Sequence, residues 1–248
     1  MSLTAEYKRQ FAWRDWRSAL DRIPIQNGQK ILDLGCGTGD ISRELALRGA
    51  RVVSIDASQE LLDVAQKNCP QNCTFIRQDL RSIQLEPEKY DGLWCSFVAA
   101  YFTDLSKVFV NWAKLLKSKS WVCVTDIDDL LGHEPLDSHY KSKINDFYND
   151  ALLKGSYDFC VGRKLENILE KSGFSVTSFY LEDKELSFNG PASSEILQAW
   201  SNRFKRMEGL KLFLGPVFQN YKTEFLKTIA HSNHRSNCKV ICCIGRRS

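Results

Sequence analysis

The block Ile31-Leu-Asp-Leu-Gly-Cys-Gly-Thr-Gly-Asp40 constrains the fold of this 248-residue chain more than any other stretch. An apolar run leads into three alternate glycines, Gly35, Gly37 and Gly39, and a helix-like segment, Ile41 to Arg48, follows at once. A buried strand, a glycine turn and a helix N-terminus in this order form a nucleotide-cofactor cradle, because glycine allows a sharp turn and close approach of the backbone to a ligand. The spacing is G-x-G-x-G, which differs from both the G-x-G-x-x-G of dinucleotide sites and the G-x-x-x-x-G-K-[ST] of triphosphate sites.

Two further apolar segments end in an acidic residue at nearly equal spacing along the chain. Arg51-Val-Val-Ser-Ile-Asp56 is rich in β-branched residues, and Cys73-Thr-Phe-Ile-Arg-Gln-Asp79 follows a helix that Ser58 can cap. Asp56 lies about 20 residues after Gly35, the offset at which an acid meets the ribose hydroxyls in a nucleotide-binding βαβ unit. A carboxylate can accept from both hydroxyls at once, so we expect Asp56, with Ala57 beside it, to bind a ribose.

These strand ends and the glycine turn resemble motif I and its neighbours in the class I S-adenosylmethionine methyltransferases. The resemblance is specific for residues 30–128 and architectural beyond them. It implies S-adenosyl-L-methionine as cofactor and S-adenosylhomocysteine as product. It also implies that Asp79 accepts from the adenine amino group, that the backbone of Leu80 donates to the adenine ring, and that Ser96 lies near the sulfonium. The cofactor-binding residues implied or expected in this way are Asp33, Gly35, Cys36, Gly37, Asp56, Ala57, Asp79, Leu80 and Ser96.

Alternating strand and helix patterns predict an α/β fold, a doubly wound and mainly parallel seven-stranded sheet with helical lid insertions. We expect one domain over residues 1–248. It has a core at 30–128 that binds S-adenosylmethionine (SAM) and two helical excursions, 129–160 and 189–235, that cover the substrate. The expected strands are 31–34, 51–56, 73–79, 90–96, 120–128, 174–188 and 238–244, and the expected later helices are 103–117, 142–154, 162–172, 193–207 and 218–229.

The segment before the glycine block, residues 1–29, is expected to carry one helix over residues 4–23. Two interpretations stay open for this helix. It packs on the domain as an ordinary N-terminal helix, or it forms a lid over the cofactor in which Arg14 or Arg17 meets a carboxylate and an aromatic side chain covers the site. The resemblance to small-molecule methyltransferases favours the lid.

Composition excludes several classes of protein. A net charge of +4 and the lack of an RNA-binding module or a dense basic stripe make a nucleic-acid partner unlikely. No stretch approaches the ~18 apolar residues of a membrane span, and the N-terminus carries no apolar signal region. Nine cysteines, an odd number, favour reduced thiols and a cytoplasmic location. Cys69 and Cys73 lack a second ligand pair, so no metal site is expected.

A methyl group on a sulfonium is already activated, so proximity and orientation account for much of the catalysis and a base is needed only for a protonated acceptor. Three candidates for a catalytic group lie after strands or in the first excursion: Tyr101, Asp126 and His133. His133 has a suitable pKa of about 6.5 for proton transfer, but it is also an ordinary loop histidine next to Glu134. Asp126 binds a cationic amine or caps a turn.

The sequence favours transfer of a methyl group to a nitrogen, oxygen or carbon atom of a small-molecule acceptor. Aromatic-rich excursions over the strand ends suit an enclosed pocket. After the fourth strand, the residues Cys95-Ser-Phe-Val98 differ from the motif with which related enzymes hold an exocyclic or amide nitrogen. Two interpretations stay open for the basic residues of the late helix, Arg203, Lys205 and Arg206. They attract an anionic substrate, or they form a solvated helix face. The alternatives are a protein or RNA methyltransferase, a SAM-fold enzyme of another reaction class such as a cyclase, and a non-catalytic SAM-binding partner protein; the oligomeric state is left open.

Overall fold

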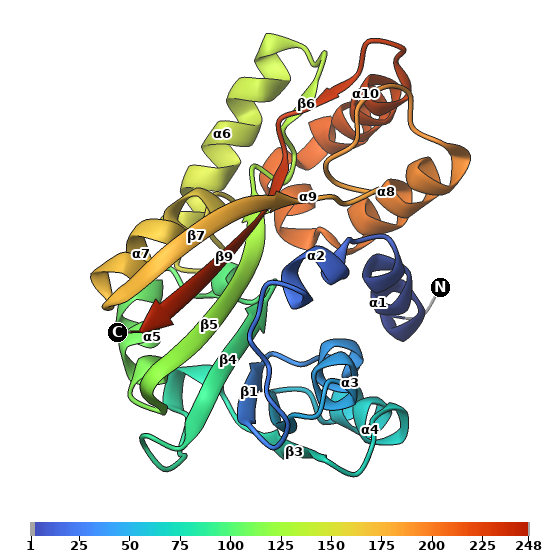
Figure 1. The fold of residues 1–248 in the computed structure, drawn as a ribbon. Helices are drawn as coiled ribbons and strands as arrows, with labels where there is room; N and C mark the ends of the chain where they lie inside the picture. Colours follow the sequence, from blue (N-terminus) through green and yellow to red (C-terminus); the bar gives the residue numbers. More distant parts are fainter. Residues whose placement is uncertain (1–2, 248) are drawn as a thin grey trace.

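The computed structural model describes residues 3–247, and its centre is a seven-stranded sheet (Figure 1). The strands of this sheet are β1 Lys30–Leu34, β2 Arg51–Asp56, β3 Cys73–Arg77, β4 Tyr90–Ser96, β5 Leu116–Asp128, β7 Phe174–Leu181 and β9 Lys239–Arg247. They lie in the order β3-β2-β1-β4-β5-β9-β7. Strands β1 to β5 are parallel, and β9 is antiparallel to both β5 and β7. The expected mainly parallel seven-stranded sheet is therefore confirmed.

Helices cover both faces of the sheet, as the doubly wound fold requires. The helices of the chain are α1 Leu3–Ala12, α2 Trp16–Leu20, α3 Asp40–Leu47, α4 Gln59–Asn68, α5 Leu105–Ala113, α6 Ser138–Leu153, α7 Leu165–Lys171, α8 Ser194–Arg206, α9 Glu208–Leu214 and α10 Phe218–Ala230. Short 3₁₀ turns are η1 Leu80–Ser82, η2 Ala99–Tyr101, η3 Gly162–Lys164 and η4 Gly215–Val217.

Successive side chains of a strand point to opposite faces, and this alternation builds two separate cores. Ile31 of β1 packs with Leu45 of α3 in the core on one face, whereas Leu32 packs with Phe109 of α5 on the other. The adjacent residues Cys242 and Cys243 divide in the same way, one into each core, as expected for neighbours on a strand. Because both faces are covered, the central strands β1, β2 and β4 are buried along most of their length, whereas the edge strands β3 and β7 are partly exposed.

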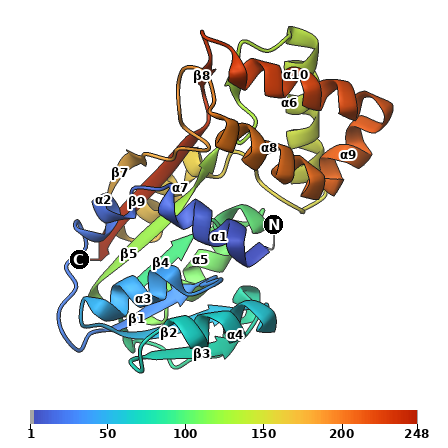
Figure 2. The same cartoon turned by 90° about the vertical axis from the view of Figure 1, so that its right-hand side faces the viewer.

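The two excursions form a helical layer beyond the carboxyl ends of the parallel strands (Figures 1 and 2). Helix α6 belongs to the first, and helices α8, α9 and α10 belong to the second. A two-stranded antiparallel sheet pairs β6 His133–Glu134, near the start of the first excursion, with β8 Arg235–Ser236, at the end of the second. Aromatic side chains fill the interior of this layer, with ring contacts among Trp200, Phe204, Tyr221 and Phe225. Helix α1 lies between α3 and α8 in both views.

The N-terminal segment differs from the single helix expected over residues 4–23. It forms two helices with a break at Trp13–Asp15, because Arg14 makes an isolated β-bridge with Asp183. The carboxylate of Asp15 then caps α2 by accepting from the backbone N–H of Ser18. The expected helix was wrong at this point because a tertiary contact overrides a continuous helical pattern.

Other boundaries also moved. The helix expected over 103–117 ends at Ala113, because β5 already begins at Leu116 to pair with β4. The strand expected to reach residue 188 ends at Leu181, since the carboxylate of Asp183 accepts from the backbone N–H groups of Glu185 and Leu186 and turns the chain. Helix α9 was not expected at all, and α6 begins at Ser138 rather than residue 142, with Asp137 as its N-cap.

Candidate active site

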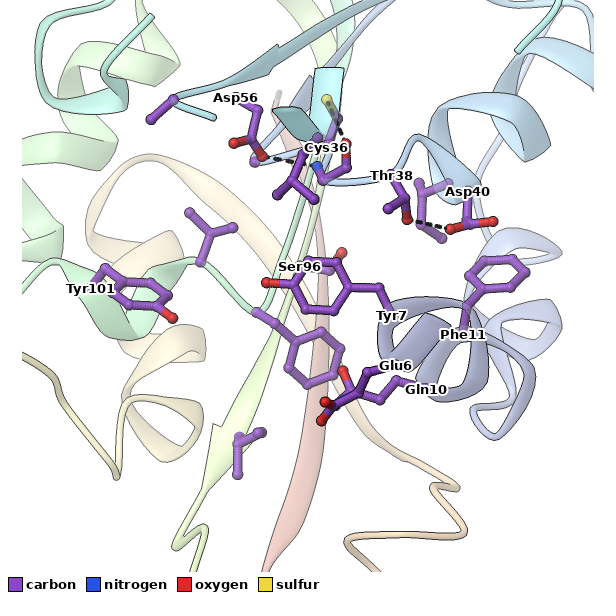
Figure 3. A pocket seen from close by; sticks show the side chains of 18 of the residues that line it. Glu6, Tyr7, Gln10, Phe11, Cys36, Thr38, Asp40, Asp56, Ser96 and Tyr101 are labelled. Atoms are coloured by element: carbon purple, nitrogen blue, oxygen red, sulfur yellow. Dashed lines mark hydrogen bonds between the residues drawn. The ribbon is translucent and has the colours of Figure 1, made fainter. Parts of the chain in front are cut away.

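A cavity of about 640 Å³ opens at the carboxyl ends of the strands, between the sheet and the helical layer (Figure 3). It lies next to β1 and β4, where the strand order reverses, which is the place where open α/β sheets bind ligands. It is surrounded by the loops after β1 to β4, helix α1 with its following turn and the C-terminal end of α8, together with Ile127 of β5 and Tyr157 after α6. The lining side chains used below are Glu6, Tyr7, Phe11, Arg14, Cys36, Asp40, Asp56, Ala57, Asp79, Leu80, Ser96, Phe97, Tyr101, Ile127, Tyr157, Arg203, Arg206 and Met207.

The glycine turn between β1 and α3 forms one wall of the cavity. Gly35, Gly37 and Gly39 all have positive φ angles, of +72°, +54° and +79°. At Gly35 a Cβ atom would lie 2.2 Å from Cγ2 of Val98, so there is no room for any side chain. The backbone N–H of Gly35 donates to the carbonyl of Ile55 and so fastens the turn to β2. The turn is thus a fixed backbone surface that a ligand can approach closely.

Asp56 at the end of β2 lies in the cavity wall and organises the loop around it. Its Oδ2 accepts from the backbone N–H of Gly37 at 2.9 Å, and its Oδ1 accepts from that of Ser58 at 2.9 Å (Figure 3). A carboxylate oxygen can accept more than one hydrogen bond, so both oxygens keep capacity for a hydroxyl group. Ala57 also lines the cavity. The geometry is compatible with the expected ribose contact.

Asp79 and Leu80 lie on the β3 side of the cavity. Asp79 is half-exposed and caps η1, with its Oδ1 accepting from the backbone N–H of Arg81 at 2.8 Å. The Leu80 carbonyl accepts from the indole N–H of Trp112, which fixes the backbone at this position. Both residues are therefore placed to meet a ligand at the edge of the sheet.

Asp33 differs from the other expected cofactor residues because it does not line the cavity. It is 1% exposed and lies beneath the glycine turn, where it accepts from the hydroxyl of Ser42. The hydroxyl of Ser54 in turn donates to Ser42. Burial raises the pKa of Asp33 to about 7, and the Ser42 hydrogen bond opposes this shift. Asp33 supports the turn from below, and its assignment as a cofactor contact remains a prediction.

Ser96, Phe97 and Tyr101 border the cavity at the end of β4. The hydroxyl of Ser96 accepts from the indole N–H of Trp94 at 3.1 Å. Phe97 has a positive φ angle of 58°, which is rare for a bulky residue, and such strain is concentrated at functional sites. Tyr101 is 53% exposed and contacts the ring of Tyr157 edge-on, with centroids 5.0 Å apart.

Tyr7 of α1 was missed by the sequence analysis and lies near the centre of the cavity. Its ring is next to Gly37, since a Cβ atom on that glycine would lie 3.7 Å from it. In Figure 3 the Tyr7 and Tyr101 side chains enter the cavity from opposite sides. Burial raises the pKa of the Tyr7 phenol, with smaller contributions from Tyr101 and Asp56. Tyr7 and Phe11 share one helix face, which was the only sequence signal.

Arg14, expected to meet a carboxylate, pairs with one in the protein itself. Its Nε donates to Oδ2 of Asp183, and both side chains are almost fully buried. The guanidinium stacks over the ring of Phe97, with 3.9 Å from Cζ to the ring centroid. Arg14 also lines the cavity. A contact with the carboxylate of a cofactor therefore remains a prediction alongside the observed pairing with Asp183.

A cluster of ion pairs extends from Arg14 and links α1 to α8. Glu185 accepts from Arg203 at 2.7 Å and from Arg9 at 2.9 Å, and Glu6 pairs with Arg206. We call Glu6, Arg9, Arg14, Asp183, Glu185, Arg203 and Arg206 the arginine cluster. Burial acts against ionisation of Glu185, but the nearby arginines outweigh it and lower its pKa.

Asp126 was expected on the rim of the site, and the structure corrects this position. It is fully buried behind the cavity, where its Oδ2 accepts from the backbone N–H of Ala100 at 3.1 Å and its Oδ1 from that of Ile127 at 2.8 Å. Burial raises its pKa to about 7, although these backbone donors oppose the shift. Asp126 thus holds η2, the turn that carries Tyr101, and contacts the cavity only through it.

His133 was expected in an exposed loop, and this is also corrected. It lies in β6, is 2% exposed, and is not among the residues that line the cavity. Its Nδ1 lies 2.9 Å from Nε2 of His234, and the rings of Trp200 and Phe225 lie edge-on beside it. Burial lowers its pKa to about 3. The structure brings Tyr101 to the cavity, but not His133 or Asp126.

Within residues 3–247, no group of three or more His, Cys, Asp or Glu side chains is arranged to hold a metal ion. The same part of the chain contains no helix of sufficient length and apolar character to cross a membrane.

Known proteins resemble the chain in both sequence and fold. A family model described as a methyltransferase domain matches residues 31–119. A ubiquinone biosynthesis O-methyltransferase of Coxiella burnetii is 32% identical over 93 residues, a match that covers 36% of this chain and 40% of the relative. The matched segment thus spans less than half the length of that relative.

Two solved structures share the fold of nearly the whole chain. Phosphoethanolamine N-methyltransferase 2 of Haemonchus contortus, in complex with S-adenosyl-L-methionine, is 22% identical with a TM-score of 0.58, over 97% of this chain and 52% of that one. An S-adenosylmethionine-dependent methyltransferase of Mesorhizobium loti is 20% identical with a TM-score of 0.56, over 94% and 97%. With its seven-stranded sheet and its glycine turn, the chain has the fold of the class I S-adenosylmethionine-dependent methyltransferases, and residues 31–119 match the methyltransferase domain.

Proposed function

We propose that this chain transfers the methyl group of S-adenosyl-L-methionine to a nitrogen, oxygen or carbon atom of a small-molecule acceptor. The observation that carries the proposal is the cavity of about 640 Å³, which runs from the glycine turn to Arg203, Arg206 and Met207 at the C-terminal end of α8. This volume is within the range of about 300–1,000 Å³ that is typical of small-molecule sites. The curated relatives named as ubiquinone biosynthesis O-methyltransferases support a small acceptor as well.

The residues present fit the cofactor. The backbone of the glycine turn lines the cavity at Gly35 and Gly37 and suits a bound methionine moiety, and Asp56 and Asp79 offer carboxylates to a ribose and an adenine. When bound, the cofactor supplies a methyl group already activated on a sulfonium. We place Cys36, Gly37, Ala57, Leu80 and Ser96 around it, and Asp33 beneath the turn.

The side chains of the cavity orient the acceptor and exclude water. Phe11, Phe97, Tyr157 and Met207 provide apolar walls, which strengthen electrostatic interactions inside the site and hold the acceptor in one orientation. Tyr101 is the candidate for holding or moving a proton at its phenol oxygen, because it is the one catalytic candidate from the sequence that reaches the cavity. Asp126 is a positioning residue for it.

The first experiment is calorimetric titration of the purified protein with S-adenosyl-L-methionine and, separately, with S-adenosylhomocysteine. Micromolar binding of both is expected. A screen with methyl-labelled cofactor against amines, phenols and carboxylates then identifies the acceptor atom. If neither compound binds, the proposal is wrong, and a non-catalytic role gains support. Binding without methyl transfer to any acceptor, but with another product, would favour a different reaction class.

Adding protein and RNA substrates to the screen tests the alternative of a macromolecular methyltransferase, which would need an open groove instead of this cavity. A cytoplasmic location is supported by the nine cysteines, all of which are free thiols.

A further inference from the structure

The two ends of the cavity carry opposite charge. At the end formed by the loops after β1 to β3, three carboxylates line the wall, Asp40, Asp56 and Asp79, and the accompanying cation is the 60%-exposed Arg81. At the end formed by α1 and α8, the lining charges are Arg14, Arg203, Arg206 and Glu6. The first end suits the sulfonium and ammonium groups of the cofactor. The cofactor carboxylate is proposed at Arg14, which leaves Arg203 and Arg206 for the acceptor. The second end faces the remaining space of the cavity, where the acceptor must lie.

The arginine cluster contains one more cation than anion. Its four guanidinium groups pair with three carboxylates, and all three carboxylate side chains are at most 2% exposed. Each arginine has a carboxylate partner, but Glu185 accepts from both Arg203 and Arg9, so the carboxylates are shared. The arginines that line the cavity, Arg14, Arg203 and Arg206, therefore keep a positive potential that a ligand anion can neutralise.

Donor groups are also left over on these arginines. Each guanidinium carries five N–H donors. Arg14 uses only its Nε for Asp183, Arg206 uses only Nη2 for Glu6, and Arg203 uses Nε and Nη2 for Glu185 within residues 3–247. Arg206 is 43% exposed and thus accessible to a ligand. Planar forks of this kind match carboxylate and phosphate groups with two parallel hydrogen bonds.

We infer that the methyl acceptor is an anion, a carboxylate or a phosphate, whose charged group binds at Arg206 and Arg203. The inference rests on the proposed function and adds the substrate class to it. The anionic group lies at the α8 end, the apolar body contacts Phe97, Tyr157 and Met207, and the nucleophilic atom is directed to the sulfonium side near Ser96. The opposite polarity of the two ends fixes the direction in which the acceptor binds.

The test uses the full chain saturated with S-adenosylhomocysteine and four probes that share a benzene ring: benzoate, phenyl phosphate, benzyl alcohol and benzylamine. Calorimetry is expected to show at least about tenfold tighter binding of one or both anions than of the alcohol or the amine, since a charge-assisted hydrogen bond adds about that factor or more. A preference between the two anions separates a carboxylate acceptor from a phosphate acceptor.

Variants locate the anion. Arg206→Met is expected to weaken the preferred anionic probe by about tenfold, Arg206→Lys by less, and neither should change the affinity for S-adenosylhomocysteine. The matched control is Lys205→Met on the same helix, which removes an equal charge from an exposed side chain outside the cavity lining and should leave the probe affinity unchanged.

Specific outcomes overturn the inference. Equal affinity for all four probes, no binding of any of them, or an unchanged anion affinity in Arg206→Met would each reject an anionic acceptor at this end. The comparison on the wild-type protein needs no variant, so misfolding of Arg206→Met does not remove the test. If the wild-type protein does not bind S-adenosylhomocysteine, the proposed function itself is rejected. Failure of the proposed function is thus distinguishable from failure of the anionic-acceptor inference.

Discussion

The buried histidine pair predicts a specific loss of stability in acid. The carbonyl of Gly190 can only accept, so Nδ1 of His234, 2.8 Å away, donates to it. Nε2 of neutral His234 then accepts from Nδ1 of His133, and Nε2 of His133 is left as an acceptor. This atom is buried and has no hydrogen-bond partner within residues 3–247. A proton added there would create a charge among aromatic rings, with no group to receive its hydrogen bond.

The magnitude follows from the pKa of His133, which burial lowers from 6.5 to about 3 in the folded protein. Between these values the unfolded chain binds a proton that the folded chain does not, so the free energy of unfolding falls as the pH decreases through this window. The slope is about 1.4 kcal/mol per pH unit, and the full window corresponds to at most about 5 kcal/mol. Asp33 and Asp126, with pKa values raised to about 7, act in the opposite direction. Between pH 3.8 and about 7 the folded chain keeps their protons while the unfolded chain loses them, so their contribution to the free energy of unfolding falls as the pH rises.

The assay therefore compares the pH dependence of the free energy of unfolding between two proteins, because the slope of the wild-type protein alone also contains the carboxyl groups. Urea unfolding of the wild-type protein and of His133→Gln is measured from pH 7.5 to 4.5. The variant is expected to be less stable at pH 7.5, and the difference should shrink by about 2–3 kcal/mol at pH 4.5. His231→Gln, at an exposed position, is the control and should follow the wild type. A difference that is constant with pH would refute the assignment of a buried neutral His133. The affinity for S-adenosylhomocysteine should be unchanged, because His133 lies outside the cavity lining.

Three further predictions test the glycine turn, the predicted ribose contact and the ion pair between Arg14 and Asp183. Asp56→Ala is expected to weaken S-adenosyl-L-methionine binding by at least about tenfold in calorimetry, since it removes a charge-assisted acceptor; unchanged binding would reject the ribose contact. Gly35→Ala should lower the melting temperature and abolish cofactor binding, because its φ angle is +72° and the new Cβ would lie 2.2 Å from Val98; a stable variant that binds the cofactor would contradict this geometry. Arg14→Met should destabilise the fold by about 3–5 kcal/mol in urea unfolding by leaving buried Asp183 unpaired, and Arg14→Met with Asp183→Asn should recover part of that loss; equal stability of the single variant and the wild type would show that the pair contributes nothing.

The sequence predicted the sheet, and it also brought together residues that line the proposed cofactor side of the cavity, because both depend on local patterns. A parallel strand buried on both faces is a short apolar run, and its carboxyl end necessarily meets those of its neighbours at one edge of the sheet. Asp56 and Asp79 could therefore be placed together without any knowledge of the tertiary structure, and both line the cavity. Asp33 follows the same pattern but lies one step deeper, under the turn, because the chain has not yet left the sheet at that position.

The acceptor side could not be predicted in the same way, because its contacts join residues that no local pattern relates. Arg14 pairs with Asp183 and Glu6 with Arg206, at separations of 169 and 200 residues. His133 had a suitable pKa as an isolated side chain, yet its environment depends on His234, which is 101 residues away. In the excursions, the aromatic periodicity indicated helices but not which helix end would face the cavity. The proposed acceptor side therefore depends on long-range ion pairs, which no local sequence pattern predicts.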